Sequence, residues 1–279
     1  MNSPEDPEAF PSPAVAMALT LAALMVMLLV LTPLFTAGHI VAGLAAGMVV
    51  GFGGVGSLAA RRVPAPAELR LGLCGVPPKR LLLVLMLTPL VLWLSELENI
   101  VALGLERPEP APLPEPSSNG AGEGLRSLQI ALFIILLRPV VEEFFFRGVI
   151  QQGVVAHLGP RGGVLLSTLL FALARTLTGP TNEYGALVII LQMLVLGGIL
   201  GGLRLATGSL LPGILLQGLM NSVELVALYL AEDFPIQGFT TLDGHTHPAL
   251  LAASGLLIAW AISRMHRLNK SIVNPVPAR

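Results

Sequence analysis

The stretch Arg138–Gln151, RPVVEEFFFRGVIQ, places two adjacent glutamates and one arginine inside a run of otherwise apolar residues. An ionised side chain at the centre of a bilayer costs about 3 kcal/mol on insertion scales, so such residues normally face the interior of a helix bundle and mark a functional site. The stretch therefore predicts a membrane-spanning helix that carries a polar site built on Glu142, Glu143 and Arg147.

The composition of the whole chain agrees with a membrane location. Of its 279 residues, 54% are hydrophobic and 12% are charged, and the mean hydropathy is +0.79, which is too apolar for a soluble domain of this size. The net charge of -1 provides no basic surface, so we expect no nucleic-acid partner. The single cysteine, Cys74, excludes an internal disulfide and a thiolate metal cluster. These features predict a polytopic protein whose surroundings are the lipid bilayer.

Eight apolar runs approach or exceed the roughly 20 residues that a helix needs to cross a bilayer. We therefore expect an all-α fold of about eight transmembrane helices, the fifth of which is short. The runs are Ala14–Phe35, Ala37–Ala60, Leu81–Leu103, Leu125–Gln152, Gly163–Leu177, Tyr184–Ala206, Ser209–Ala231 and Pro248–Arg264.

Basic residues predict the orientation, because loops rich in Lys and Arg tend to stay in the cytoplasm. If the N-terminus is cytoplasmic, the outer segments hold only Arg107 and Arg126, and the inner segments hold most of the other basic residues. Both termini are therefore expected in the cytoplasm, and a prokaryotic source would make the membrane the plasma membrane.

The expected organisation has five parts. A cytoplasmic tail, 1–13, precedes three leading helices, 14–103, and a basic cytoplasmic tail, 265–279, follows a five-helix core, 125–264. The linker between the two groups of helices, 104–124, is rich in Pro, Glu and Gly and cannot build a packed core. The chain shows no internal repeat, which argues against a transporter or channel that uses the buried charges as an ion path.

Polar residues of three predicted helices are expected at one depth in the membrane. With a rise of about 1.5 Å per residue, Glu142 lies about 15 Å from the inner end of its helix, and Gln217 and Asn221 lie about 12 and 18 Å from theirs. Arg175 lies about 18 Å into its own helix by the same rise. Because Gln217 and Asn221 are four residues apart, they face one side. We therefore expect these groups to converge.

The two glutamates are expected to have different roles. Glu143 and Arg147 are four residues apart with the glutamate first, the better order for an ion pair along one face of a helix. Glu142 is rotated by about 100° from Glu143 and points elsewhere. One carboxylate can thus be structural while its neighbour is free for chemistry. The alternative is that the charges only fix the register of the helices.

Three blocks of the sequence resemble the motifs of the CAAX protease and bacteriocin-processing (CPBP, or Abi) family of intramembrane proteins, which includes the type II CAAX prenyl endopeptidases. VVEEFFFRG is similar to the family motif E-E-x-x-x-R. LLFALAR is similar to F-x-x-x-H, with Phe171 matching and Arg175 in place of the histidine. TGSLLPGILLQGLMN is similar to a block that ends in H-x-x-x-N, with Asn221 matching and Gln217 in place of the histidine. The resemblance covers roughly Leu125–Val226.

The resemblance implies an eight-helix bundle, open to the membrane and the cytoplasm, in which a glutamate activates water to hydrolyse a peptide bond. Carried over to this chain, it implies that Glu142 is the general base, that Arg147 is the partner of Glu143, and that Asn221 is an oxyanion donor. It implies substrates that are prenylated CAAX-type peptides or small membrane-associated peptides. We expect no cofactor and no metal.

The two departures from the motifs act against hydrolysis. A guanidinium at Arg175 stabilises the carboxylate form of Glu142, weakens it as a base and can fill the space of the reacting water. Gln217 can donate a hydrogen bond but cannot exchange a proton as imidazole does. Two functions therefore stay open. One is an endopeptidase with an altered site. The other is a catalytically silent pseudoprotease that binds a membrane peptide or a partner protein, for which an Arg175–Glu142 ion pair is predicted.

Overall fold

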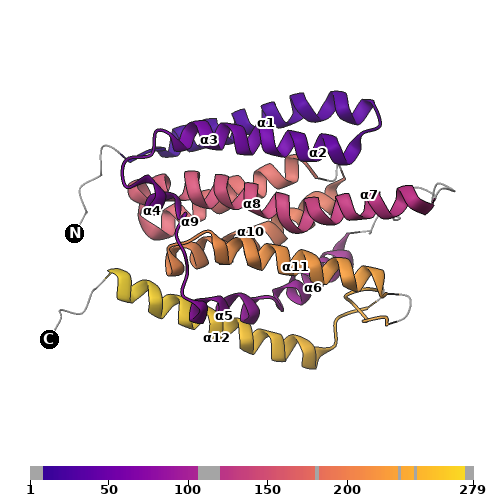
Figure 1. Cartoon of the computed structure of the whole chain (residues 1–279). Coiled ribbons are helices and arrows are strands. Elements are labelled where there is room, and N and C mark those ends of the chain that lie inside the picture. The colour runs from indigo at the N-terminus through magenta and orange to yellow at the C-terminus, as the bar shows by residue number, and fades with distance from the viewer. Residues whose placement is uncertain (1–8, 106–119, 180–181, 232–233, 242–243, 274–279) are drawn as a thin grey trace.

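The computed structural model describes residues 9–105, 120–179, 182–231, 234–241 and 244–273, and these parts of the chain are almost entirely helical (Figure 1). Most of the predicted linker, 104–124, lies outside the described residues. The same holds for residues 1–8 and 274–279 of the two predicted tails.

The first part of the chain forms three long helical segments and one short helix, α4. The first two make a hairpin that turns at Gly38, whose φ of 83° favours glycine. The third is interrupted at Pro89, because proline has no N–H to donate to the preceding turn. The bounds are α1 (Pro13–Thr36), α2 (Ile40–Met48), the π-helical segment η1 (Val49–Gly54), α3 (Val55–Ala60), α4 (Ala67–Leu71), α5 (Pro78–Leu87) and α6 (Leu90–Gly104).

The second part begins with one long helical path that carries the charged stretch. It includes two π-helical segments, which in other proteins often accompany functional sites. The path breaks at Gly159, with a φ of 74°, followed by Pro160, so the rest of α9 is a separate helix. The bounds are α7 (Gly120–Leu132), η2 (Phe133–Leu137), α8 (Arg138–Glu142), η3 (Glu143–Ile150), α9 (Gln151–Leu177), α10 (Glu183–Thr207), α11 (Leu211–Tyr229) and α12 (Pro248–Val273).

Six of the described helices are long and apolar enough to cross a membrane, so the chain is an integral membrane protein. The predicted fourth and fifth spans exist as helices but are not among these six. These two helices carry Glu142, Glu143, Arg147 and Arg175, and the predicted count of eight crossing helices is not confirmed. The six are Pro13–Thr36, Ile40–Ala60, Pro78–Gly104, Glu183–Thr207, Leu211–Tyr229 and Pro248–Asn269.

The bundle is built around α10, which packs against α9, α12, α6 and α11. In Figure 1 the hairpin of α1 with α2 and α3 covers one side of the bundle, and α5 with α12 covers the other. Four phenylalanines, Phe52, Phe145, Phe146 and Phe171, pack with ring centroids 5.0–5.5 Å apart. Such pairs each stabilise by about 0.5–1.5 kcal/mol beyond their burial. This cluster fixes η3 between the hairpin and α9.

Candidate functional site

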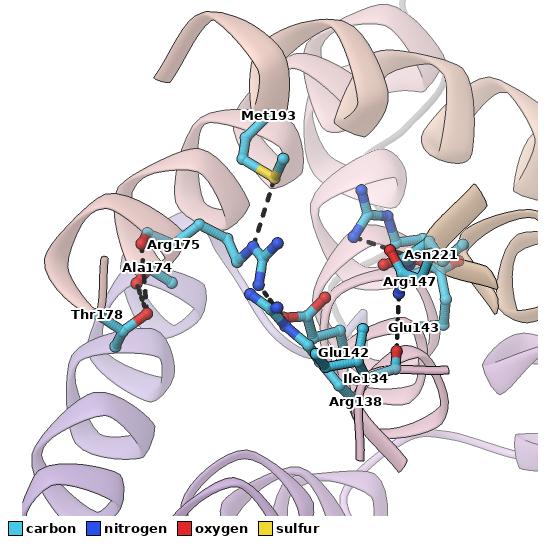
Figure 2. A network of polar contacts seen from close by, with 11 residues as sticks. Ile134, Arg138, Glu142, Glu143, Arg147, Ala174, Arg175, Thr178, Met193 and Asn221 are labelled. Atoms are coloured by element: carbon cyan, nitrogen blue, oxygen red, sulfur yellow. Dashed lines mark hydrogen bonds and ion pairs between the residues drawn. The ribbon is translucent and has the colours of Figure 1, made fainter. Parts of the chain in front are cut away.

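The two adjacent glutamates point to different partners, as their rotation about the helix predicts (Figure 2). Glu142 ends α8 and Glu143 begins η3. Both side chains are buried, with 2% and 1% of their residue surface exposed. The polar contacts of each therefore come from the protein.

Glu142 is held by two arginines. Its Oε1 lies 3.1 Å from Arg138 Nε and 3.4 Å from Arg175 Nη1. The Arg175–Glu142 ion pair that the pseudoprotease alternative predicts is thus present. Arg175 is further positioned by Met193, whose Sδ lies 3.4 Å from its Nε. One carboxylate oxygen therefore accepts hydrogen bonds from two permanently charged groups (Figure 2).

Glu143 forms the buried ion pair that the sequence predicts. Its Oε1 lies 3.2 Å from Arg147 Nη1 and accepts a hydrogen bond of 2.9 Å from Gln217 Nε2. The same guanidinium also lies 4.2 Å from the centroid of the Phe171 ring, and its Nη2 donates to the Gly197 carbonyl oxygen at 3.4 Å. Arg147 Nη1 is within ion-pair distance of Glu143 but is not aligned for a hydrogen bond. The interaction there is mainly one of charge.

Gln217 and Asn221 lie on α11 as expected, but neither amide donates a hydrogen bond to Glu142. Gln217 donates to Glu143, and Asn221 Nδ2 donates to the carbonyl oxygen of Ile134 at 2.7 Å. Ile134 belongs to η2 (Phe133–Leu137), so Asn221 ties α11 to the π-helical segment before α8. The predicted convergence on Glu142 therefore includes Arg175 but not the two amides, because helical spacing gives depth and not the direction in which a helix is rotated.

Gly213 gives Glu143 its place beside α11. A Cβ at this position would clash with Glu143 Oε2 and lie 2.9 Å from its Cδ. The absence of a side chain thus lets the carboxylate approach the helix backbone closely. This glycine is part of the block TGSLLPGILLQGLMN, and its role is to leave space next to the ion pair.

A cavity of about 390 Å³ lies next to Glu142. Its polar lining consists of Glu142, Arg126, Arg138, Arg175 and Thr178. The rest of the lining is mainly apolar and comes in large part from the N-terminal hairpin and from α7 and η2: Met27, Ile40, Val41, Leu44, Met48, Phe52, Ile130, Phe133, Ile134, Phe146 and Ala174. A larger cavity of about 880 Å³ lies by the Gly159 break and α12, away from the charged cluster.

Sequence reasoning missed two features of this site. Arg138 was not assigned to Glu142, although the two are four residues apart and that spacing was a usable signal. The contribution of α1 and α2 to the cavity had no signal, because the hairpin reaches the site only through tertiary packing. In the part of the chain that the structure describes, no group of three His, Cys, Asp or Glu side chains is close enough together to hold a metal.

The fold and this buried cluster define a polytopic α-helical membrane protein with a charged intramembrane site. Residues 124–223 match the family model described as type II CAAX prenyl endopeptidase Rce1-like, a range close to the stretch predicted from the three motif blocks. The predicted family resemblance is confirmed over this segment of the chain. No curated protein and no solved structure matches the chain.

Proposed function

We propose that the protein is a catalytically silent relative of the membrane endopeptidases, and that it binds a membrane-associated peptide or a segment of a partner protein. The observation that carries this proposal is the double ion pair at Glu142, whose Oε1 lies within 3.4 Å of both Arg138 and Arg175. Glu142 is the residue that the family resemblance makes the general base.

A general base must take a proton from a water that lies within hydrogen-bond distance. Two guanidinium groups hold one carboxylate oxygen of Glu142, so this oxygen is already engaged and is not available to a reacting water. The other implied catalytic groups are also engaged, since Gln217 donates to Glu143 and Asn221 donates to Ile134. Arginine and glutamine side chains, unlike histidine, do not take up and release protons near neutral pH. These contacts support binding without hydrolysis.

The cavity supports the binding part of the proposal. Its volume of about 390 Å³ is in the range of small-ligand sites, and its apolar walls with a few convergent polar groups are typical of them. A peptide segment in the membrane would place apolar side chains against these walls. Prenylated peptides are one class of candidate, because the matched family model is that of a CAAX prenyl endopeptidase.

A working endopeptidase is the second candidate, and one observation favours it. Glu142 Oε2 is buried next to the cavity and has no hydrogen-bond partner among the described residues. A movement of the surrounding side chains would expose this oxygen to water in the cavity. In this candidate Glu142 is the general base, the Glu143–Arg147 pair positions it, and Asn221 turns from Ile134 to the oxyanion.

A cleavage assay separates the two candidates. Purified protein and its Glu142→Gln variant are incubated in proteoliposomes with a panel of prenylated CAAX peptides, and products are measured by mass spectrometry. An active type II CAAX endopeptidase serves as the positive control for the panel. We expect no difference between the natural protein and Glu142→Gln. Cleavage by the natural protein that Glu142→Gln abolishes would show that it is an enzyme.

We also propose that both termini face the cytoplasm. The segments that the sequence places in the cytoplasm carry most of the basic residues outside the helices, which supports this orientation. The start of α1 and the end of α12 also lie at the same end of the bundle (Figure 1). Cys74, the single cysteine, lies in the connection before α5 and is partly exposed. A membrane-impermeant maleimide should label it from the cytoplasmic side alone, and labelling from the outer side would reverse the orientation.

A further inference from the structure

The cavity of about 880 Å³ is a groove between α9 and α12. Both helices pack against α10, but within the described residues they make at most slight contact with each other. α10 is therefore the floor of this α9–α12 groove, and its walls are the end of α12 and the part of α9 that follows the Gly159 break. The groove shares no lining residue with the charged cluster around Glu142 and Glu143.

The floor of the α9–α12 groove is open at Gly198. Leu194 and Gly198 are four residues apart and Leu205 lies about two turns further on, so all three can face one side of α10. A Cβ at Gly198 would meet no atom of another helix within 4 Å. The wall on α9 is apolar at Val164 and Leu165. The groove can therefore take an apolar chain without moving a side chain of the floor.

The length of the floor matches the depth of one leaflet of a bilayer. With a rise of about 1.5 Å per residue, Leu194 and Leu205 are about 16 Å apart along α10. The hydrocarbon core of a bilayer is about 30 Å thick, so one leaflet is about 15 Å deep. Leu205 lies two residues before the end of α10 at Thr207. The groove thus runs from the membrane surface to about the midplane, the depth that an acyl chain occupies.

Polar side chains gather at the surface end of the groove. Arg161 lies beside the Gly159 break, and His266 and Asn269 lie near the end of α12. In the described part of the chain, none of these three side chains forms an ion pair or a hydrogen bond. All three carry N–H groups that can donate to the acceptor oxygens of a phosphate, and the planar guanidinium matches a phosphate especially well.

The charge at this end of the groove is positive. The sequences of α9 and α12 contain no Asp or Glu, and the one acid of α10, Glu183, begins that helix at the opposite end. Arg264 and Arg267 on α12 are exposed and add positive charge near His266. A basic pocket between transmembrane helices is a typical binding place for the headgroup of an anionic lipid.

We propose that the α9–α12 groove binds one anionic phospholipid, with its phosphodiester on Arg161 and His266 and one acyl chain along Gly198. A phospholipid joins an anion to a chain that is one leaflet long, which is the combination that the groove accommodates. A zwitterionic lipid would place a cation beside Arg161. Because the groove is separate from the charged cluster, this inference does not depend on whether Glu142 acts on water.

The test is native mass spectrometry of the full-length protein released from detergent micelles. The probes are palmitoyl-oleoyl phosphatidylglycerol and palmitoyl-oleoyl phosphatidylcholine, which have the same chains and differ in net charge. We expect one molecule of phosphatidylglycerol to bind at least about 10-fold more tightly than phosphatidylcholine, since hydrogen bonds to charged groups are the stronger ones. Equal affinities for the two lipids would overturn the inference.

A headgroup variant tests the position of the anion. Arg161→Gln should weaken phosphatidylglycerol about 10-fold and leave phosphatidylcholine nearly unchanged. Arg161 has no partner among the described residues, so this variant should keep the stability of the lipid-free protein. Arg61→Gln, which removes an exposed arginine just after α3, is the matched control and should change neither affinity. A phosphatidylglycerol affinity that Arg161→Gln does not lower would contradict the proposed site.

A floor variant tests the position of the acyl chain. Gly198→Leu fills the open space, so it should weaken both lipids by about 10-fold or more through loss of buried chain area. Leucine is a better helix former than glycine, so α10 should keep its structure, which circular dichroism checks. Gly198→Ala adds one methyl group and should change the affinities by less than about 5-fold. Unchanged binding by folded Gly198→Leu protein would show that the chain lies elsewhere.

The same spectra distinguish a second occupant of the groove. If the natural protein is a dimer that Gly198→Leu converts to a monomer, a helix of a second copy fills the groove and the lipid proposal is wrong. The cleavage assay of the proposed function uses different variants and probes. A positive cleavage result would overturn the proposed function alone, and equal affinities for the two lipids would overturn this inference alone.

Discussion

Replacing Arg147 with methionine is expected to lower the free energy of unfolding by about 3–5 kcal/mol, because it leaves the buried carboxylate of Glu143 without its counter-charge. Both side chains are 1% exposed and their charged atoms are 3.2 Å apart. A methionine side chain can still pack on Phe171, so the decrease in unfolding free energy reports mainly the loss of the positive charge. The measurement is reversible unfolding in mixed detergent micelles, followed by circular dichroism.

Two control variants test whether the loss of stability comes from the buried Glu143–Arg147 ion pair. Arg161→Met removes an exposed arginine and should change stability by no more than about 0.5 kcal/mol. The double variant Glu143→Leu, Arg147→Met removes both charges, and it should recover much of the lost stability, since replacing a whole buried pair by apolar residues is often neutral. An Arg147→Met protein as stable as Arg161→Met would show that the pair does not hold η3.

The double variant Arg175→His, Gln217→His is expected to gain cleavage of prenylated CAAX peptides, by about 100-fold or more over the natural protein. It restores both histidines of the family motifs and removes one of the two guanidinium groups from Glu142. Arg138 remains 3.1 Å from the carboxylate, so a further Arg138→Gln substitution should raise the rate again.

The same peptide panel and mass spectrometric readout apply to these variants. Addition of Glu142→Gln to the double variant should abolish the gained activity, which would exclude a contaminating protease. If the double variant is folded and cleaves no peptide that the active control enzyme cleaves, the absence of the two family histidines does not explain the lack of cleavage by the natural protein.

The helices could be predicted closely because their signals are local. The first predicted span, Ala14–Phe35, corresponds to α1 (Pro13–Thr36), and the sixth, Tyr184–Ala206, corresponds to α10 (Glu183–Thr207). The sixth run is bounded by Asn182, which caps α10 by accepting a hydrogen bond from Gly185 N, and by Gly208, which follows the last residue of α10. The Glu143–Arg147 pair is equally local, because four-residue spacing places both groups on one face.

The arrangement of the site could be predicted only in part. Depth along a helix indicated that Arg175 and Glu142 would meet, and their ion pair is present. Depth could not show that Gln217 would turn to Glu143 or that Asn221 would bond to the Ile134 carbonyl. Those contacts depend on how α11 is rotated against η2 and η3, which is decided by tertiary packing.

The central claim is that the carboxylate of Glu142 forms stabilising ion pairs with Arg138 and Arg175. The most direct test is a double-mutant cycle of Glu142→Gln and Arg175→Gln, measured by unfolding in mixed micelles. The account predicts a favourable coupling energy of about 1 kcal/mol or more, as for residues in contact within one ion-pair network. Additive effects, within about 0.3–0.5 kcal/mol, would mean that Arg175 and Glu142 do not interact, which would contradict the claim that Arg175 holds the carboxylate.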